Sequence, residues 1–553
     1  MALLPLRCFQ AALLAHLAVS VVIRAEQDSK YFALNYTPNA ACDLPIPPSM
    51  PKDPTMKHYG KGTFTQPLLH KAPELGNFTV NYYWNSTFWA GSGSPIVVFL
   101  PGEVKADRHL VFSRPDFSLV GVIAENLRAA VIVPEHRYYG GSSPFAELTT
   151  SNLSYLTVED ALLDIVNLAN HFNPPWTDAP STAQDVPWIL TGGSYSGAQT
   201  AWVANVFGGV FWAYVACSPI VQSITSYWQY YLPQIEHGRQ VCTSLMDRIL
   251  SYIDSVFQTN GTQVQTIKDL FGLPTMDDES FLYEITTPVT FWSEQELGRP
   301  ARQYNWLCDL IEGIESDYHL LPAGVMALLT SEGVERRGEW NSPHIQMLRA
   351  LHGYAEGFRQ EISPALCFKD GFCTSKLDPE NFMYSDLRVD NDDNRQYAWL
   401  QCNDLISGYI VGAPQNETSL VSRLTTAEFF LEQCALFFPN GPNGETFGAK
   451  KGRTAHMLNE YTGGWSPKNA TRIIYSSGSG DVWREMGVAA QRRPGGPMQS
   501  IPEQDIVVHV IETGFHHSEL MTRTAEKYPE VRKVRDLEVE QICSWVQQWP
   551  GYR

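Results

Sequence analysis

Basic residues are too few in this sequence for a chain that binds nucleic acid. The 553 residues include 40 Lys and Arg against 59 Asp and Glu, which gives a formal net charge of −19 at pH 7. Nucleic-acid-binding proteins instead gather an excess of positive charge on one face. We therefore expect no nucleic-acid partner.

Metal-binding patterns are also absent. No two cysteines are separated by two residues, and no cysteines and histidines cluster at the spacing of a zinc site. The sequence also contains no internal repeat and no low-complexity tract, which argues against a repeat protein. We expect neither a metal nor a cofactor.

Apolar runs long enough to cross a membrane are missing beyond the N-terminal region. Arg7 precedes an apolar stretch at 11–23, and "AVS" at 18–20 or "IRA" at 23–25 offers a cleavage site. This pattern predicts a signal peptide over 1–25. The alternative is an uncleaved anchor, which the short apolar run disfavours. The C-terminus lacks the pattern of a GPI signal. We therefore expect a secreted protein, or one of the vacuolar or lysosomal lumen.

Cysteines and glycosylation sequons agree with secretion. Of the ten cysteines, Cys8 lies in the predicted signal peptide, so an odd number remains and one must be unpaired. Cys217 lies in an apolar segment and is the candidate for a buried free thiol. The N-x-S/T sequons predict glycosylation at Asn35, Asn77, Asn85, Asn152, Asn260, Asn416 and Asn469.

Buried strands and helices alternate over the first part of the chain, which is long enough for two or three domains. Strand patterns occur at 77–84, 94–100, 129–134 and 186–190, and helix patterns at 156–172 and 198–211. This alternation indicates a parallel sheet with crossover helices.

Helical patterns then dominate until about residue 440, and strand patterns return only at 471–481 and 505–514, before a helix at 537–549. We therefore predict an α/β core in two parts, 26–217 and 441–553, interrupted by a helical insertion at 218–440.

A serine between glycines, Ser194, follows the predicted strand at 186–190 and precedes a helix. A sharp strand–turn–helix places the serine Oγ clear of the sheet and directs the next backbone N–H, that of Tyr195, at a developing oxyanion. In the usual motif a glycine stands two residues after the serine. Here Ser196 takes that position and the glycine is Gly197. The motif alone therefore leaves a Gly/Ser loop as an alternative to a nucleophile.

The partners of a catalytic serine also occur in a suitable order. A serine hydroxyl becomes a nucleophile when a histidine accepts its proton and a carboxylate orients that histidine. Asp481 follows one late strand, and His516 and His517 follow the next. Because the carboxyl ends of parallel strands meet at one edge of a sheet, we expect these side chains near Ser194.

Seven segments along the core carry a family resemblance. They are "FTQPLLH" (64–70), "NYYWNSTFW" (81–89), "PEHRYYGGSSPF" (134–145), "LTVEDAL" (156–162), "GGSYSGA" (192–198), "GDVW" (480–483) and "GFHHSEL" (514–520). These segments resemble the serine peptidase family of lysosomal Pro-X carboxypeptidase, dipeptidyl peptidase II and thymus-specific serine protease. The serine after "GGSY" resembles the fungal secreted branch of that family.

The resemblance implies an α/β-hydrolase fold with a helical cap and cleavage of peptides after proline. It places the nucleophile on Ser194, the carboxylate on Asp481 and the base on His516, the first of the histidine pair. It also implies that Trp483 forms an aromatic wall of a proline pocket and that Glu103 meets a substrate amine.

The same resemblance implies three disulfides, Cys242–Cys308, Cys367–Cys373 and Cys402–Cys434, which leaves Cys42 and Cys543 for each other. The chain departs from the family pattern at three places. Leu69 stands where the family often has Asp, Val482 replaces a proline, and "PGE" at 101–103 replaces a glycine-rich loop. The last departure bears on recognition of the substrate end.

Three hypotheses of function follow. The first is a serine peptidase that acts on proline-containing peptides. The second is an esterase or lipase, because fold alone does not separate these activities. The third is a non-catalytic relative used for binding, which the complete set of triad residues disfavours. The sequence leaves open carboxypeptidase, dipeptidyl peptidase or endopeptidase action, and also the oligomeric state, a homodimer included. For Glu135, His136 and Arg137 we expect a structural ion pair rather than catalysis.

Overall fold

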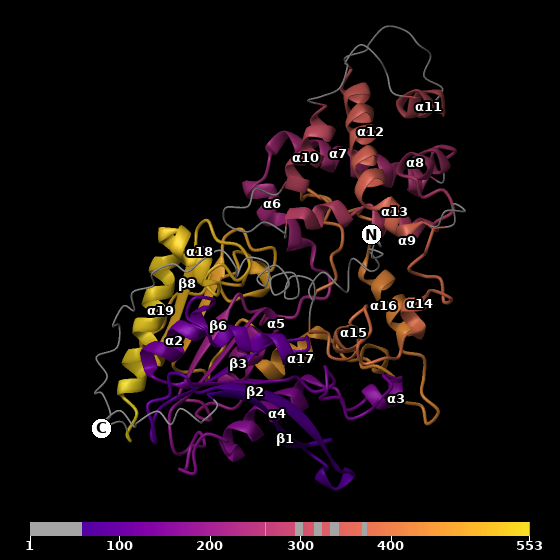
Figure 1. Ribbon diagram of the computed structural model, residues 1–553. Helices are drawn as coiled ribbons and strands as arrows, with labels where there is room; N and C mark the ends of the chain where they lie inside the picture. The colour runs from indigo at the N-terminus through magenta and orange to yellow at the C-terminus, as the bar shows by residue number, and fades with distance from the viewer. Residues whose placement is uncertain are drawn as a thin grey trace, which may run out of the picture. The chain divides into compact units, whose positions relative to one another are not determined.

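The computed structural model describes residues 58–259, 261–292, 302–313, 323–331, 342–367, 373–406 and 408–551 (Figure 1). The predicted signal peptide, Asn35, Cys42 and Asn260 lie outside these residues. The chain divides into two compact units. We call Ile224–Asp386 with Gly408–Phe437 the helical unit. The core unit holds the described residues up to Ser223 together with Leu387–Ser407 and those from Phe438 onward.

The core unit is built on one eight-stranded sheet with the order β1-β2-β4-β3-β5-β6-β7-β8. The strands are β1 (Tyr59–Pro67), β2 (Asn77–Asn85), β3 (Ile96–Leu100), β4 (Ala130–Pro134), β5 (Trp188–Gly193), β6 (Ala213–Cys217), β7 (Ile473–Gly478) and β8 (Ile506–Ile511). β2 runs antiparallel to β1 and β4, and the strands from β4 to β8 are parallel. This order and direction are those of the α/β-hydrolase fold, as predicted.

Helices cover both faces of the sheet. The helices of the core unit are α2 (Leu119–Leu127), α3 (Thr150–Leu153), α4 (Val158–His171), α5 (Ser194–Val206), α15 (Arg395–Asn403), α17 (Ala455–Thr462), α18 (Thr522–Lys527) and α19 (Pro529–Gln547). Val97 and Phe99 of β3 pack in one apolar cluster with residues of α2 and α19. Leu100 instead lines a pocket with Ile165 and Leu168 of α4. Alternate strand residues thus face opposite helical layers, as the pleat requires.

Strand β1 was not predicted from the sequence. It is an edge strand in which exposed and partly buried residues alternate and which contains two glycines, so it lacks the apolar β-branched run of a buried strand. Its register pairs Gly60 with Trp84 and Gly62 with Tyr82 of β2. A Cβ atom at Gly60 would lie 2.9 Å from the Trp84 indole, and one at Gly62 would lie 2.3 Å from the Tyr82 hydroxyl. The glycines are there because aromatic rings of the neighbouring strand cover them.

The helical unit consists of helices and short 3₁₀ segments. Its α-helices are α6 (Leu232–His237), α7 (Gln240–Gln258), α8 (Gln263–Phe271), α9 (Asp278–Glu284), α10 (Arg302–Glu312), α11 (Ala323–Ser331), α12 (Pro343–Glu361), α13 (Ser363–Leu366), α14 (Phe382–Ser385) and α16 (Ala427–Phe437). α7, α10 and α12 pack against one another. Among the described residues, no helix has the length and apolar character needed to cross a membrane.

Two of the disulfides implied by the resemblance are present within the helical unit. Cys242 of α7 bonds to Cys308 of α10, and Cys367 bonds to Cys373. Cys402, Cys434 and Cys543 are each disulfide-bonded as well. Cys217 is a free and buried cysteine, as its apolar segment predicts.

One segment of the expected insertion packs with the core unit instead. Leu387–Ser407, which contains α15, belongs to the core unit. Asn394, at the start of α15, accepts a hydrogen bond from the Tyr139 hydroxyl at 3.0 Å. The Trp399 indole donates to the Leu156 carbonyl at 2.8 Å. These contacts join residues far apart in the sequence, so helical periodicity alone did not reveal them.

Candidate active site

Ser194 lies at a strained turn between β5 and α5. It is the first residue of α5 and has a φ of 56°, in the left-handed region that non-glycine residues seldom adopt. Such a conformation costs on the order of 1–3 kcal/mol and persists where the surrounding structure enforces it. The serine at the sharp strand-to-helix turn of α/β-hydrolases has this geometry.

The glycines around Ser194 allow β5 and α5 to approach closely. A Cβ atom at Gly192 would lie 2.3 Å from the Ser196 carbonyl oxygen. A Cβ atom at Gly197 would lie 2.8 Å from the Cys217 carbonyl oxygen at the end of β6. Neither position has room for a side chain, because the atoms it would meet belong to the backbone.

Ser196 explains how the turn forms without the usual glycine. Its Oγ accepts a hydrogen bond from the Gly193 N–H at 3.0 Å and donates one to the Gly193 carbonyl at 2.8 Å. The hydroxyl therefore closes the turn on its own backbone, in the manner of a capping box. The departure from the usual motif leaves the strained Ser194 conformation intact.

Asp481 and His516 form a buried hydrogen-bonded pair. Oδ2 of Asp481 lies 2.8 Å from Nδ1 of His516, and Oδ1 accepts the Trp483 N–H at 2.9 Å. A carboxylate only accepts hydrogen bonds, so Nδ1 carries the proton and Nε2 is left as an acceptor. Nε2 of His516 is buried and has no hydrogen-bond partner in the described part of the chain. The pair thus presents an unoccupied basic nitrogen.

His517 lies close to both His516 and Gly193 of the serine turn. Its ring stacks on His516 with 4.0 Å between the ring centroids, and its backbone N–H donates to Ser218 Oγ. A Cβ atom at Gly193 would lie 2.8 Å from the His517 Nε2. Burial, followed by the neighbouring His516, holds the pKa of His517 well below its usual value, so this ring is neutral. The histidine pair therefore lies beside the residue that precedes Ser194.

Tyr195 is fixed by its side chain. Its ring is fully buried, and its hydroxyl lies 3.2 Å from Nε2 of His136. As a first-turn residue of α5, it has a backbone N–H without a partner from the helix itself. This N–H is the predicted donor to the oxyanion.

Glu103 is a buried carboxyl in the loop after β3. Burial raises its pKa to about 7, against smaller lowering effects from its own backbone N–H and from His516. Its backbone carbonyl accepts a hydrogen bond from Asn394 Nδ2 at 3.3 Å. The interaction with His516 places this carboxyl near the histidine pair, and in acid it is uncharged.

Trp483 is buried close to Asp481, with 6% of its surface exposed. Its backbone N–H holds Asp481 Oδ1, so the residue supports the carboxylate whatever side chain it carries.

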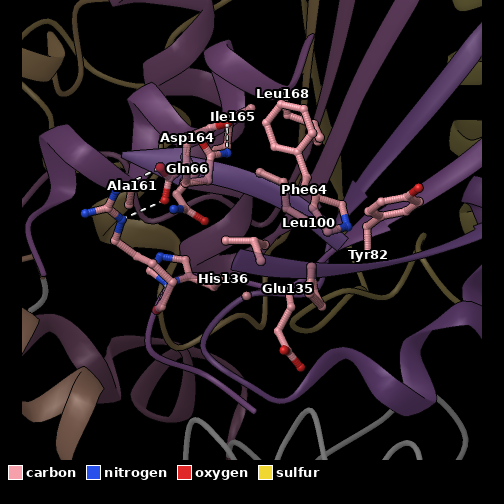
Figure 2. A pocket seen from close by; sticks show the side chains of 16 residues that line it. Phe64, Gln66, Tyr82, Leu100, Glu135, His136, Ala161, Asp164, Ile165 and Leu168 are labelled. Carbon is pink, nitrogen blue, oxygen red and sulfur yellow. Dashed lines mark hydrogen bonds and ion pairs between the residues drawn. The ribbon is translucent and has the colours of Figure 1, made fainter. Parts of the chain in front are cut away.

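The "EHR" segment builds a structural network around a pocket (Figure 2). The Arg137 guanidinium contacts Asp164 of α4 through Nε at 2.6 Å and Nη2 at 2.7 Å. Glu135 accepts hydrogen bonds from Asn81 Nδ2 at 2.9 Å and from the Gly141 N–H at 3.0 Å. The prediction of a structural ion pair is confirmed for Arg137. Its partner Asp164 was missed, although an acidic residue on the apolar face of the predicted helix 156–172 was a signal.

The described sequons differ in exposure. Asn77, Asn416 and Asn469 are exposed. Asn85 donates through Nδ2 to Ser113 Oγ, and Asn152 donates through Nδ2 to the Glu147 carbonyl. A glycan is attached at Nδ2, so the three exposed residues are the better acceptors.

The chain is similar to several known proteins. The chain is 32% identical over 516 residues to the serine protease vicPa of Bipolaris victoriae (strain FI3), covering 91% of each chain. It is 30% identical over 183 residues to the lysosomal Pro-X carboxypeptidase of Pongo abelii, covering 31% of this chain and 35% of that one. Among solved structures, a carboxyl esterase from Bacillus coagulans is 10% identical, with a TM-score of 0.30 and coverage of 89% of this chain and 99% of that one.

The model of one peptidase family matches residues 71–294 and 373–538, which include the serine turn, Asp481 and the histidine pair. The match spans most of both parts of the core unit and much of the helical unit. The chain is therefore a serine-type peptidase and belongs to the serine carboxypeptidase S28 family.

Proposed function

We propose that this chain hydrolyses peptide bonds on the C-terminal side of proline through a Ser194–Asp481–His516 triad and an acyl-enzyme. The proposal rests on the buried Asp481–His516 pair, in which Nε2 of His516 has no hydrogen-bond partner among the described residues. Ser194 has a strained backbone and, like both members of the pair, follows a strand of the parallel part of the sheet. This arrangement has the parts that acyl transfer needs: a nucleophile, a base and a group that orients the base.

In the proposed reaction, Nε2 of His516 accepts the proton of Ser194 as Oγ attacks the carbonyl carbon of the proline residue. Asp481 holds Nδ1–H of His516 and stabilises the imidazolium. The Tyr195 N–H, with an N–H of the 101–103 loop, donates to the oxyanion. The imidazolium then protonates the leaving amine, and water attacks the acyl-enzyme with His516 again as the base.

The specificity for proline is proposed from the substrate's shape and from the Trp483 indole. An acylated proline is compact, apolar and rigid and has no N–H, so its pocket requires a flat apolar wall and no hydrogen-bond acceptor. Trp483 follows Asp481 by two residues and carries such a wall. The name of the Pro-X carboxypeptidase relative agrees with this choice.

Glu103 is the candidate for contact with a charged substrate end. A substrate ammonium group would stabilise the carboxylate form of this buried residue. Aminopeptidase-type action would follow if Glu103 meets the substrate N-terminus. Cleavage of peptides blocked at neither end, at the N-terminus or at the C-terminus distinguishes this from carboxypeptidase and endopeptidase action.

We also propose secretion or delivery to a vacuolar or lysosomal lumen. The N-terminal signal pattern, the disulfides and the exposed sequon residues Asn77, Asn416 and Asn469 support an oxidising, glycosylating route. Treatment of the secreted protein with an N-glycosidase, followed by mass spectrometry, identifies the sites in use.

Replacement of the candidate nucleophile tests the proposed reaction. Ser194→Ala should lower kcat on a proline-containing peptide by about 10⁶-fold, the usual cost of losing a triad nucleophile. Ser143→Ala is the matched control, because Ser143 Oγ donates to the nearby Phe145 carbonyl and takes no part in the proposed site. A phosphonylating reagent should label wild type and the control at Ser194. Activity of Ser194→Ala within tenfold of wild type would refute the triad, and a preference for simple esters over peptides would favour the esterase alternative.

A further inference from the structure

Two buried carboxyl groups lie beneath the loop that carries the histidine pair. Glu519 follows His516 by three residues, and Glu538 projects from α19; both side chains are fully buried. Ser476 of β7 and the free thiol of Cys217 at the end of β6 complete the cluster, each at most 2% exposed. The cluster thus joins the histidine loop, two central strands and α19, and the proposed mechanism uses none of its four side chains for proton transfer.

Few hydrogen-bond donors serve these carboxyl groups. Ser476 Oγ donates to Glu519 Oε1 at 2.7 Å, and the Cys217 thiol also interacts with Glu519. Ser476 also interacts with Glu538 and lowers its pKa, but the single proton of the Ser476 hydroxyl is donated to Glu519. Oε2 of Glu519 and both carboxyl oxygens of Glu538 have no hydrogen-bond partner among the described residues. Two such groups cannot both be ionised without a large cost.

The surrounding charges do not offset this cost. Arg535 lies one turn before Glu538 on α19 and lowers its pKa, but its guanidinium donates to Asp536. Asp481, on the other side, raises the pKa of Glu519. The neutral His517 ring adds no positive charge, and the His516 ring is paired with Asp481.

Burial is accordingly the dominant effect on both acids. It raises the pKa of Glu519, and burial together with Glu519 raises the pKa of Glu538 well above its usual value. The pair therefore retains protons in acid that an exposed carboxyl would have lost.

We propose that Glu519 is a positioning residue that, in its protonated form, anchors the histidine loop to β6 and β7, and that ionisation of the Glu519–Glu538 pair at higher pH releases this anchor. The proposal rests on the proposed function in taking His516 as the base. The protonated Glu519 carboxyl accepts from Ser476 and adds no second negative charge behind Asp481. Once both acids are charged, they repel each other across the gap between the loop and α19.

The direction of the pH effect follows from the raised pKa values. The stability that the pair contributes is fully present below the usual carboxyl pKa of about 4.3 and is lost as pH rises through the folded-state values. The enzyme should therefore lose both loop order and activity on the alkaline side. This restricts activity to acidic surroundings, independently of the substrate.

Amide and alanine variants test the anchor. Glu519→Gln is a permanent mimic of the protonated acid, so kcat/KM near pH 5 should stay within about threefold of wild type. Its alkaline limb should move up by about one pH unit or more. Glu519→Ala removes the anchor and should lower kcat/KM at least tenfold near pH 5, with a smaller difference from wild type at alkaline pH, where the wild-type anchor is released. Glu538→Gln, which removes the repelling partner, should shift the alkaline limb in the same direction as Glu519→Gln.

The matched control is Glu284→Gln in α9 of the helical unit. Glu284 is likewise buried, with its pKa raised mainly by burial. This variant should leave the pH profile of kcat/KM unchanged. Any of three results would overturn the proposal. The alkaline limb could stay unshifted in both Glu519→Gln and Glu538→Gln, Glu519→Gln could be as impaired as Glu519→Ala, or Glu284→Gln could shift the limb equally.

A second measurement separates this proposal from the proposed function. Thermal unfolding, followed by tryptophan fluorescence from pH 4 to 9, needs no catalytic activity. The fall in melting temperature between pH 5 and 8 should be smaller in Glu519→Gln and Glu538→Gln than in wild type. Each variant lacks one of the two buried carboxyl groups that ionise over this pH range. If this fall is reduced while no proline peptide is cleaved, the proposed function fails and the anchor stands. If the fall is unchanged, the anchor fails whatever the substrate.

Discussion

Replacement of Glu103 by Gln should make the core unit less sensitive to alkaline pH. Glu103 is buried, and burial raises its pKa from 4.5 to about 7. Between these two values the unfolded chain has lost the proton and the folded chain has kept it. Stability from this group is therefore fully present below about pH 4.5 and is lost as pH rises through 7.

The magnitude follows from the size of the shift. A rise from 4.5 to about 7, at about 1.4 kcal/mol per pH unit, corresponds to about 3 kcal/mol of unfolding free energy. Glutamine resembles the protonated acid and does not titrate. Wild type and Glu103→Gln should thus have similar stability at pH 4, and at pH 8 the variant should be more stable by about 3 kcal/mol. The Glu519–Glu538 pair is common to both proteins and cancels from the difference.

Urea unfolding at pH 4, 6 and 8, followed by tryptophan fluorescence, measures this difference. Glu512→Gln is the matched control, because Glu512 is exposed and its replacement also removes one carboxyl group. The control should follow wild type at each pH. The buried carboxyl does not retain its proton if the unfolding free energies of wild type and Glu103→Gln change equally with pH. A Glu103→Gln variant less stable than wild type at pH 8 would show the same.

The remaining predictions concern the catalytic geometry. His516→Ala should reduce kcat at least 10⁴-fold, whereas His517→Ala should retain substantial activity, because of the two histidines His516 is the one hydrogen-bonded to a carboxylate. Steady-state assays of both variants measure this difference. A larger loss of kcat in His517→Ala than in His516→Ala would assign the base to His517. Trp483→Ala should lower kcat/KM for proline peptides by roughly 10–200-fold while phosphonylation of Ser194 survives; equal loss of both would mean that the indole supports the triad instead of the substrate. Gly193→Ala should reduce kcat by about 10²-fold without unfolding the protein, because the new Cβ would displace the His517 ring; wild-type kcat in this variant would contradict the observed packing.

Most strands of the sheet and the candidate catalytic residues were predictable from the sequence for physical reasons, whereas β1 and β6 were not predicted. β3, β4, β5 and β7 are buried on both faces, so their apolar runs stand out from the surrounding turns. Ser194 and Asp481 follow two of these strands, His516 follows the partly exposed β8, and the ends of parallel strands meet at one edge. A strand-end residue can therefore be placed before any contact is known.

Features that depend on distant contacts were not predictable in this way. Glycines in β1 weaken a strand pattern, and only the rings of Trp84 and Tyr82 explain them. Glu519 stands in the quoted "GFHHSEL" segment, yet its burial becomes evident only with Glu538 of α19 opposite. α15 is attached to the core unit by individual hydrogen bonds, such as that between Asn394 and Tyr139. Such bonds produce no periodic pattern in the sequence.

The division of the chain into two units has a consequence for biosynthesis. The polypeptide leaves the core unit after Ser223, and β7 and β8 are translated only after the whole helical unit. A nascent chain that ends before Ile473 holds β6 as an incomplete sheet edge, while the Cys242–Cys308 bond can already form within the helical unit. Asp481 and His516 are translated after the whole helical unit. With His516 as the proposed base, we expect the nascent peptidase to stay inactive until nearly all of the core unit has been made.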